Sequence, residues 1–228
     1  MENKEKKRVL VFAPHADDEI LGVGGTISKE IKRNSSIVYI CIITSGDVSM
    51  FPEKEIKKVR LEAKSAHKYL GVKETIFLDF PAVKINEVSK KDLNFKVQGV
   101  INKVKPDIVY TPHIGDIHLD HRIVTETVMV ACRPINNCSV KKIYMYETLS
   151  ETGWNIPNVT NEFIPNVYED ISDFIDEKLY ALKKYETQLK DYPNPRSIKS
   201  IIALSQYRGS TILVDNAEAF VLIREINS

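Results

Sequence analysis

Three short apolar runs rich in β-branched residues constrain the fold of this chain more than any other feature. They span Arg8–Ala13, Ile37–Ile43 and Ile108–Thr111. Near-continuous apolar runs of this length are typical of strands that are buried on both faces, as in parallel sheets. Helical patterns separate the runs, so the sequence predicts an α/β architecture in which helices cover both faces of the sheet.

Further elements extend this alternation. Shorter strands are predicted at Thr75–Leu78, Lys142–Tyr146 and Ala217–Ile223. Helices are predicted over residues 20–33, 53–70, 93–104, 122–132, 173–190 and 195–207, and Gly71 is expected to stop the second of them. With right-handed crossovers, these elements predict a three-layer, mostly parallel sheet. We expect residues 151–167 to be a loop-rich insert and the C-terminal part to form a cap of helices and loops.

Length and composition indicate one domain over residues 1–228, with residues 1–7 as a flexible tail. A chain of 228 residues can bury one substantial core, and no repeat or low-complexity linker divides it. The net charge of +1, from 32 basic and 31 acidic residues, gives no footprint for nucleic acid. No apolar run approaches the about 20 residues that a transmembrane helix needs.

A cytoplasmic location is expected from two features. The charged N-terminus does not resemble a signal peptide. The three cysteines, Cys41, Cys132 and Cys138, show no C-x-x-C spacing, which favours free thiols in a reducing compartment.

A polar cluster, Pro14-His15-Ala16-Asp17-Asp18-Glu19, follows the first strand directly. Charges beside a core are costly unless they are paired, so we expect this cluster to bind a metal ion. His15 and Asp18, three residues apart, project from one side of a helical turn and can chelate one ion. Asp17 points elsewhere and is free to act as a base. The alternative is that the acids only cap the following helix.

A second polar cluster, Gly115-Asp116-Ile117-His118-Leu119-Asp120-His121, follows the strand at Ile108–Thr111. His118 and His121 are again three residues apart, with Asp120 between them. His113 lies nearby, and we expect it to support the site or cap the helix. The alternative interpretation of the whole cluster is a polar loop that caps the next helix.

Each cluster strengthens the metal-site interpretation of the other, because both follow buried strands and ligands bind at the carboxyl ends of strands in open α/β sheets. If the first and fourth strands are neighbours, His15, Asp18 and one histidine of the second cluster can share a metal. Two imidazoles and a carboxylate suit catalytic Zn²⁺, and the same set describes Fe(II) oxygenases. A spare aspartate and a spare histidine favour hydrolysis. The rival functions are an Fe(II) oxygenase and a non-catalytic metal- or sugar-binding protein.

In these residues the chain resembles the LmbE/PIG-L-like family of zinc-dependent N-acetyl-sugar deacetylases, which carry a P-H-x-D-D-E signature and a second motif similar to Asp116-x-His118-x-Asp120-His121. The resemblance extends from about residue 8 to residue 225. It includes Arg60-x-Glu62-Ala63, Tyr185–Gln188, Tyr192–Ser197, Tyr207–Gly209 and Ala217–Phe220. The chain departs from the family where Pro81-Ala82-Val83 replaces the usual P-D-G.

The resemblance implies a Rossmann-like fold and a role for each matching residue. The implied zinc ligands are His15, Asp18 and His121, with Fe²⁺ as the alternative metal. Asp17 matches the general base, and His118 matches the residue that stabilises the oxyanion and protonates the leaving amine. Asp120 would orient and charge His118, and Arg60 would bind substrate.

The implied activity is hydrolysis of a linear amide C–N bond in a small-molecule N-acetylated amino sugar or glycoconjugate. Specificity is expected to lie in the loops at Ser45–Glu53, Pro81–Lys90 and Glu151–Val167. The chain is compatible with a homo-oligomer.

Three expectations concern residues outside this set. His67 lies between Ala66 and Lys68 on a polar helix face and is expected at the surface. Glu19 is expected only to support the helix start. Gly22-Val23-Gly24-Gly25 begins nine residues past the strand and therefore does not fit a dinucleotide-binding loop, so close helix packing is expected there.

Overall fold

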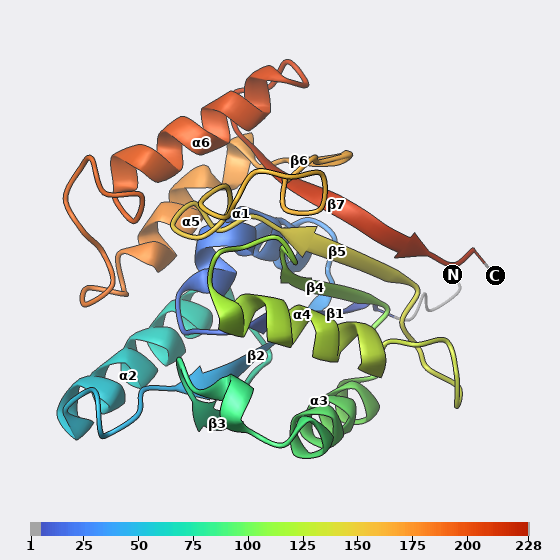
Figure 1. Ribbon diagram of the computed structural model, residues 1–228. Coiled ribbons are helices and arrows are strands. Elements are labelled where there is room, and N and C mark those ends of the chain that lie inside the picture. Colours follow the sequence, from blue (N-terminus) through green and yellow to red (C-terminus); the bar gives the residue numbers. More distant parts are fainter. Residues whose placement is uncertain (1–5, 228) are drawn as a thin grey trace.

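The computed structural model describes residues 6–227, and residues 1–5 of the expected N-terminal tail lie outside the described part. Seven strands form one sheet in the order β3-β2-β1-β4-β5-β7-β6 (Figure 1). The first five strands run parallel, and β7 pairs antiparallel with both β5 and β6. Their bounds are β1 Arg8–Ala13, β2 Ile37–Ser45, β3 Glu74–Pro81, β4 Ile108–Pro112, β5 Lys142–Tyr146, β6 Val167–Asp170 and β7 Ala217–Glu225. The predicted mostly parallel α/β sheet is confirmed.

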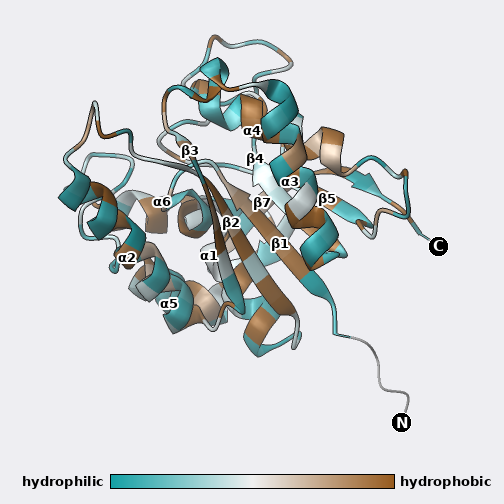
Figure 2. Ribbon diagram, turned by 90° about the horizontal axis from the view of Figure 1, so that it is seen from below, coloured by the Kyte–Doolittle hydropathy of each residue, from teal (hydrophilic) through white to brown (hydrophobic). Residues whose placement is uncertain are grey.

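Helices cover both faces of the sheet, which gives the three predicted layers (Figures 1 and 2). Their bounds are α1 Asp18–Lys32, α2 Glu53–Leu70, α3 Lys90–Val104, α4 Leu119–Ala131, α5 Ile175–Leu182 and α6 Ile198–Ser210. One core contains buried residues of α1, α2, α5 and α6, and the other contains those of α3 and α4. Among the described residues, no helix is both long and apolar enough to cross a membrane.

Strand β1 shows why the strand runs are apolar throughout. Val9, Val11 and Ala13 belong to the first core, whereas Leu10 and Phe12 belong to the second. Successive side chains of a strand point to opposite faces, so a strand between two helical layers needs apolar residues at every position. This is the pattern from which the sheet was predicted.

The C-terminal part differs from the prediction in its boundaries. The helix predicted over residues 173–190 is a short 3₁₀ turn (Ser172–Phe174) followed by α5, which ends at Leu182. The chain turns there because Tyr185 is fully buried in the first core and Thr187 donates from its backbone N–H and its hydroxyl to Glu62. The last helix begins at Ile198, where the Ser197 hydroxyl accepts the N–H of Ser200. The sequence did not predict β6.

The glycines of α1 allow close packing, as expected. A Cβ atom added to Gly22 would lie 2.2 Å from Cδ2 of Tyr146, and one added to Gly25 would lie 2.7 Å from Cδ1 of Ile171. Gly71 ends α2 in the left-handed conformation with φ of 88°, which confirms the predicted stop.

A buried ion pair joins the middle of α1 to α5 and β7. The Lys178 ammonium donates to the carboxylate of Glu218 at 2.6 Å and to the carbonyl of Leu21 at 2.8 Å. The Glu218 carboxylate also accepts the backbone N–H groups of Gly25 and Thr26. Both charged side chains are nearly inaccessible to solvent. The pair therefore bonds to backbone N–H and C=O groups in the middle of α1. The first turn of the same helix carries Asp18 and Glu19 of the first polar cluster.

Replacing Lys178 by methionine should lower the free energy of unfolding by about 3–5 kcal/mol, because the Glu218 carboxylate would be left buried without its cation. Urea unfolding followed by circular dichroism measures this loss. Lys32→Met is the matched control, since Lys32 forms a partly exposed pair with Glu177 that is worth about 1 kcal/mol or less. Equal losses in the two variants would contradict the assigned importance of the buried pair.

Candidate active site

The two polar clusters meet at the carboxyl edge of the sheet. Strand β1 pairs with β4 in parallel from Val9 and Ile108 to Val11 and Tyr110. The first cluster follows β1 and enters α1, and the second follows β4 and enters α4. The neighbouring placement on which the metal hypothesis depended is therefore present.

His15, Asp18 and His121 lie together at this edge. The Asp18 Oδ2 atom is 3.2 Å from Nδ1 of His15 and 3.2 Å from Nε2 of His121. One donor atom from each residue lies within 4.8 Å of the others. Asp18 Oδ1 and His121 Nε2 are buried and have no hydrogen-bond partner. Buried polar atoms without partners are costly, and a cation among these three side chains would satisfy them. The donor set fits a divalent metal.

A second set of donors, His15, His118 and Asp120, is equally compact. In this set the Asp120 Oδ2 atom already accepts the backbone N–H of Val83 at 2.8 Å and lies 3.1 Å from Nε2 of His15. The first set is more deeply buried, and two of its buried atoms, Asp18 Oδ1 and His121 Nε2, have no hydrogen-bond partner, against Asp120 Oδ1 alone in the second set, so the first set fits a metal better.

His121 is held in its orientation by Asp116, for which no role was predicted. Its Nδ1 atom bonds to the Asp116 carboxylate at 2.8 Å, which directs Nε2 toward Asp18. Asp116 in turn accepts the hydroxyl hydrogen of Thr152 at 2.6 Å. A carboxylate behind a histidine is the usual way in which proteins orient a metal ligand. The signal in the sequence was the aspartate five residues before His121.

The imidazoles of the site are surrounded by carboxylates. Burial lowers the pKa of His15, but hydrogen bonds to Asp120 and Asp18 outweigh it and raise the pKa to about 9. For His121, Asp18 and Asp116 likewise outweigh burial and raise the pKa to about 10. The site therefore stabilises positive charge, whether it is carried by protons or by a metal ion.

Asp17 lies beside the first donor set, His15, Asp18 and His121, which we call the metal-ligand set because it could hold an ion. Its φ is 131°, which is rare for a residue other than glycine, and its N–H donates to Glu19 at 3.1 Å. Burial raises the pKa of the Asp17 carboxyl to about 7, while the guanidinium of Arg196, 3.5 Å away, opposes this shift. The Oδ2 atom is buried and accepts no hydrogen bond. An aspartate with this pKa and a free oxygen is suited to take up and return a proton.

His118 and Asp120 interact differently from the arrangement that the resemblance implied. The Nδ1 atom of His118 accepts the backbone N–H of Asp120 at 3.1 Å, whereas the Asp120 carboxylate contacts His15. Burial, His15 and His121 lower the pKa of His118 to about 4. His118 is thus a neutral imidazole near neutral pH, and its proton is on Nε2. Asp120 orients His118 through its backbone N–H, and its carboxylate raises the pKa of His118 by less than burial and the two histidines lower it.

The expectations for His67 and Glu19 were wrong. His67 is 2% exposed, and its two ring nitrogens bond to Thr75 at 2.8 Å and to Glu19 at 3.0 Å. Glu19 is fully buried and also accepts the hydroxyl of Tyr185 and the N–H of Asp17. His67 lies among polar neighbours on its helix and was therefore predicted at the surface. It is buried because the segment after α5, which includes Tyr185, packs over this face of α2. This network supports the strained backbone at Asp17.

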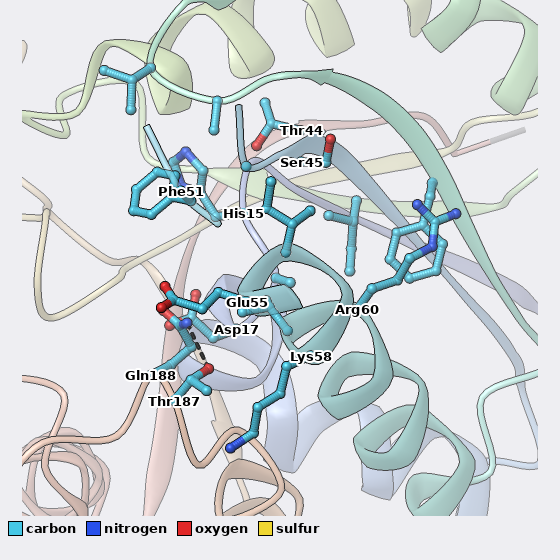
Figure 3. Close-up of a pocket in the computed structure, with 18 of the residues that line it drawn as sticks. His15, Asp17, Thr44, Ser45, Phe51, Glu55, Lys58, Arg60, Thr187 and Gln188 are labelled. Atoms are coloured by element: carbon cyan, nitrogen blue, oxygen red, sulfur yellow. Dashed lines mark hydrogen bonds between the residues drawn. The ribbon is translucent and has the colours of Figure 1, made fainter. Parts of the chain in front are cut away.

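A cavity of about 730 Å³ opens beside the metal-ligand set (Figure 3). His15, Asp17 and His118 line one side of it, and Thr187, Gln188 and Arg196 approach from the C-terminal cap. This volume lies toward the upper part of the range of about 300–1,000 Å³ found for small-molecule sites. Thr187, Gln188 and Arg196 lie in segments that resemble the family, but no role was predicted for them.

Arg60 lines the same cavity from α2 (Figure 3). Its guanidinium is 3.9 Å from the centre of the Phe77 ring and bonds to Asp79 at 2.5 Å. His113 contacts neither donor set and bonds to the carbonyl of Asn161 at 3.2 Å. The structure therefore brings Arg60 to the cavity and places His113 beneath the 151–167 insert.

The fold and the site define a class: an α/β protein with a histidine–aspartate metal-type cluster at the carboxyl edge of its sheet. Residues 10–132 match the family model described as PIG-L, GlcNAc-PI de-N-acetylase. The chain belongs to this family.

Two curated relatives cover most of the chain. It is 29% identical to an uncharacterized deacetylase, YaiS, of Escherichia coli K12 over 80% of this chain and 92% of that protein. It is also 29% identical to the diacetylchitobiose deacetylase of Thermococcus kodakarensis over 81% of this chain and 71% of the other.

Solved structures share the fold at lower identity. The N,N′-diacetylchitobiose deacetylase of Pyrococcus horikoshii superposes with a TM-score of 0.76 at 22% identity, over 97% of this chain and 85% of that one. The 4-carboxy-2-hydroxymuconate hydratase GalB of Pseudomonas putida KT2440 gives 0.77 at 17% identity, over 97% and 98%. Because enzymes with different reactions share it, the fold alone does not define the activity.

Proposed function

We propose that the chain is a metal-dependent hydrolase that removes the acetyl group from an N-acetylglucosamine-type amino sugar or glycoconjugate. The reaction would break a linear amide C–N bond and release acetate and a free amine. The observation that carries the proposal is the Asp17 carboxylate, whose buried Oδ2 accepts no hydrogen bond, beside the donor set His15, Asp18 and His121 and on the wall of a ligand-sized cavity. The deacetylase names of the two relatives support the same reaction.

The three donor residues would hold the metal, with Zn²⁺ as the ion that we propose. When bound, such an ion would polarise the amide carbonyl and make water more acidic. Asp116 holds the His121 ring in the orientation that this requires. The choice of Zn²⁺ over Fe²⁺ is part of the proposal, because the donor set suits both ions.

Asp17 is proposed to accept the proton of the attacking water while the water oxygen forms a bond to the acetyl carbon. The Nε2–H of His118 would donate a hydrogen bond to the carbonyl oxygen as negative charge develops on it. The C–N bond then breaks, and Asp17 returns its proton to the leaving nitrogen. We prefer Asp17 to His118 for this last step because the low pKa of His118 leaves it without a second proton. Arg60 and Arg196, which both line the cavity, would hold sugar hydroxyl groups.

Acetate release tests this proposal. The purified protein, loaded with Zn²⁺ or with Fe²⁺, is incubated with N-acetylglucosamine, diacetylchitobiose and simple N-acetylglucosaminides. We expect equal amounts of acetate and free amine, in a reaction that a chelator stops. Turnover that requires oxygen and a 2-oxo acid would instead support an Fe(II) oxygenase. Binding of sugars without release of acetate under either metal would support a non-catalytic protein.

A further inference from the structure

Besides His15 and Asp17, the cavity is lined by residues of α2 and of the carboxyl end of β2 (Figure 3). Six large apolar side chains line this cavity, and we call the space that they border the apolar chamber: Ile42, Phe51, Ile56, Val59, Phe77 and Val83. All of them except Ile42 keep part of their side-chain surface exposed. Apolar surface that borders a cavity next to a reaction centre favours a ligand group that would cover it.

The cations that line the cavity all have carboxylate partners. Arg60 bonds to Asp79 at 2.5 Å, and Arg196 lies 3.5 Å from Asp17. The remaining contacts are longer: Lys58 to Glu62 at 3.8 Å, Lys58 to Glu186 at 3.6 Å, and Arg196 to Glu151 at 3.8 Å. A phosphate or carboxylate on the substrate would have to compete with these acids. The charges around the cavity thus favour a neutral substituent.

The backbone conformation of Val83 is an independent indication that the cavity binds an apolar group. Its φ is 66°, in the left-handed region where a β-branched residue is strained and where Asn, Asp or Gly would be at ease. The conformation aims its N–H at Asp120, at 2.8 Å, but any residue could provide that N–H. The valine side chain is half-exposed and lines the chamber.

We infer that the sugar substrate carries a neutral apolar substituent, an alkyl or aryl group, and that this group binds in the apolar chamber while the acetamide lies at the metal-ligand set. The inference rests on the proposed deacetylase function for its reaction, but the chamber itself is a binding site that can be tested separately. It places Val59 and Val83 as specificity-determining residues.

A series of β-glycosides of N-acetylglucosamine tests the chamber. The probes are the methyl, butyl and hexyl glycosides and a 5-carboxypentyl glycoside, which matches hexyl in length but carries a charge. We expect kcat/KM to rise about three- to fourfold for each added methylene group that is buried. The 5-carboxypentyl glycoside should fall back toward the methyl glycoside. A flat profile across the neutral series would overturn the inference.

Matched variants locate the effect. Val59→Asn should flatten the dependence on chain length, and so should Val83→Asn, in which asparagine accepts the positive φ and keeps the protein folded. Leu61→Asn is the control, because Leu61 is 66% exposed on the same helix and does not line the cavity. The control should keep the wild-type slope. A slope that survives in both chamber variants would also overturn the inference.

Calorimetric binding separates this inference from the proposed function. The same glycosides are titrated into metal-loaded wild-type protein and into Asp17→Asn. If affinity rises with alkyl length but no acetate is released, the inference about the apolar chamber is supported and the deacetylase proposal is refuted. If acetate is released and neither affinity nor kcat/KM depends on alkyl length, the deacetylase proposal is supported and the inference about the apolar chamber is refuted. Absence of both binding and release would refute both.

Discussion

Replacing Asp17 by asparagine should lower kcat by about 10²- to 10⁴-fold, the usual contribution of a positioned general base. Asparagine keeps the shape of the side chain and tolerates the positive φ of this position. It removes the carboxylate that we propose as the base, whose Oδ2 accepts no hydrogen bond and whose pKa burial raises to about 7. Acetate release under saturating substrate measures the loss, and elemental analysis should show unchanged metal content.

The control for this variant is Asp173→Asn, which removes an aspartate from an exposed pair with Arg33 far from the cavity. It should keep wild-type turnover. If Asp17→Asn turned over substrate at the wild-type rate with its metal in place, Asp17 could not be the base, and His118 would be the next residue to examine.

His121→Ala should abolish metal binding, the second large effect. Its Nε2 atom is one of three donors that face each other, and two ligands hold a divalent ion far more weakly than three. Elemental analysis after gel filtration measures bound metal per chain. Asp116→Asn should have a smaller effect, a loss of about 10- to 100-fold in affinity, because it removes only the partner that orients His121.

His113→Ala provides the matched control for loss of a nearby histidine, since His113 belongs to neither donor set. Retention of a full metal equivalent in His121→Ala would point to the other set, His15, His118 and Asp120. Circular dichroism distinguishes a lost ligand from a lost fold.

The sheet and the meeting of the two polar clusters could be predicted because both follow from local pattern. Strands flanked by two helical layers must be apolar at every position, as β1 shows, and parallel strands end at a common edge. The i, i+3 spacing of His15 and Asp18 indicated that they could share an ion, although His15 lies in the bend before α1 and Asp18 is the first residue of the helix. The α/β class is confirmed, while the roles of the site residues stay predictions for the experiments above.

What could not be predicted depends on contacts between distant segments. His67 looked like a surface residue because its helix neighbours are polar, and only the packing of Tyr185 reveals that it is buried. The helix predicted to residue 190 ends at Leu182 because Tyr185 and Thr187 bond across the chain to other helices. Asp120 could not be assigned to His15 rather than His118 from spacing alone, since all three lie in reach of one another.

The buried pair of Lys178 and Glu218 has a consequence for the order in which the site is built. The first half of the site lies within 20 residues of the N-terminus, yet the helix that carries Asp18 is completed by a carboxylate from β7, the last strand. During synthesis, α1 therefore lacks two of its backbone partners until residue 218 has emerged. We therefore expect the start of α1, where Asp18 lies, to become fully ordered only after β7 has paired, which couples the integrity of the last strand to the site.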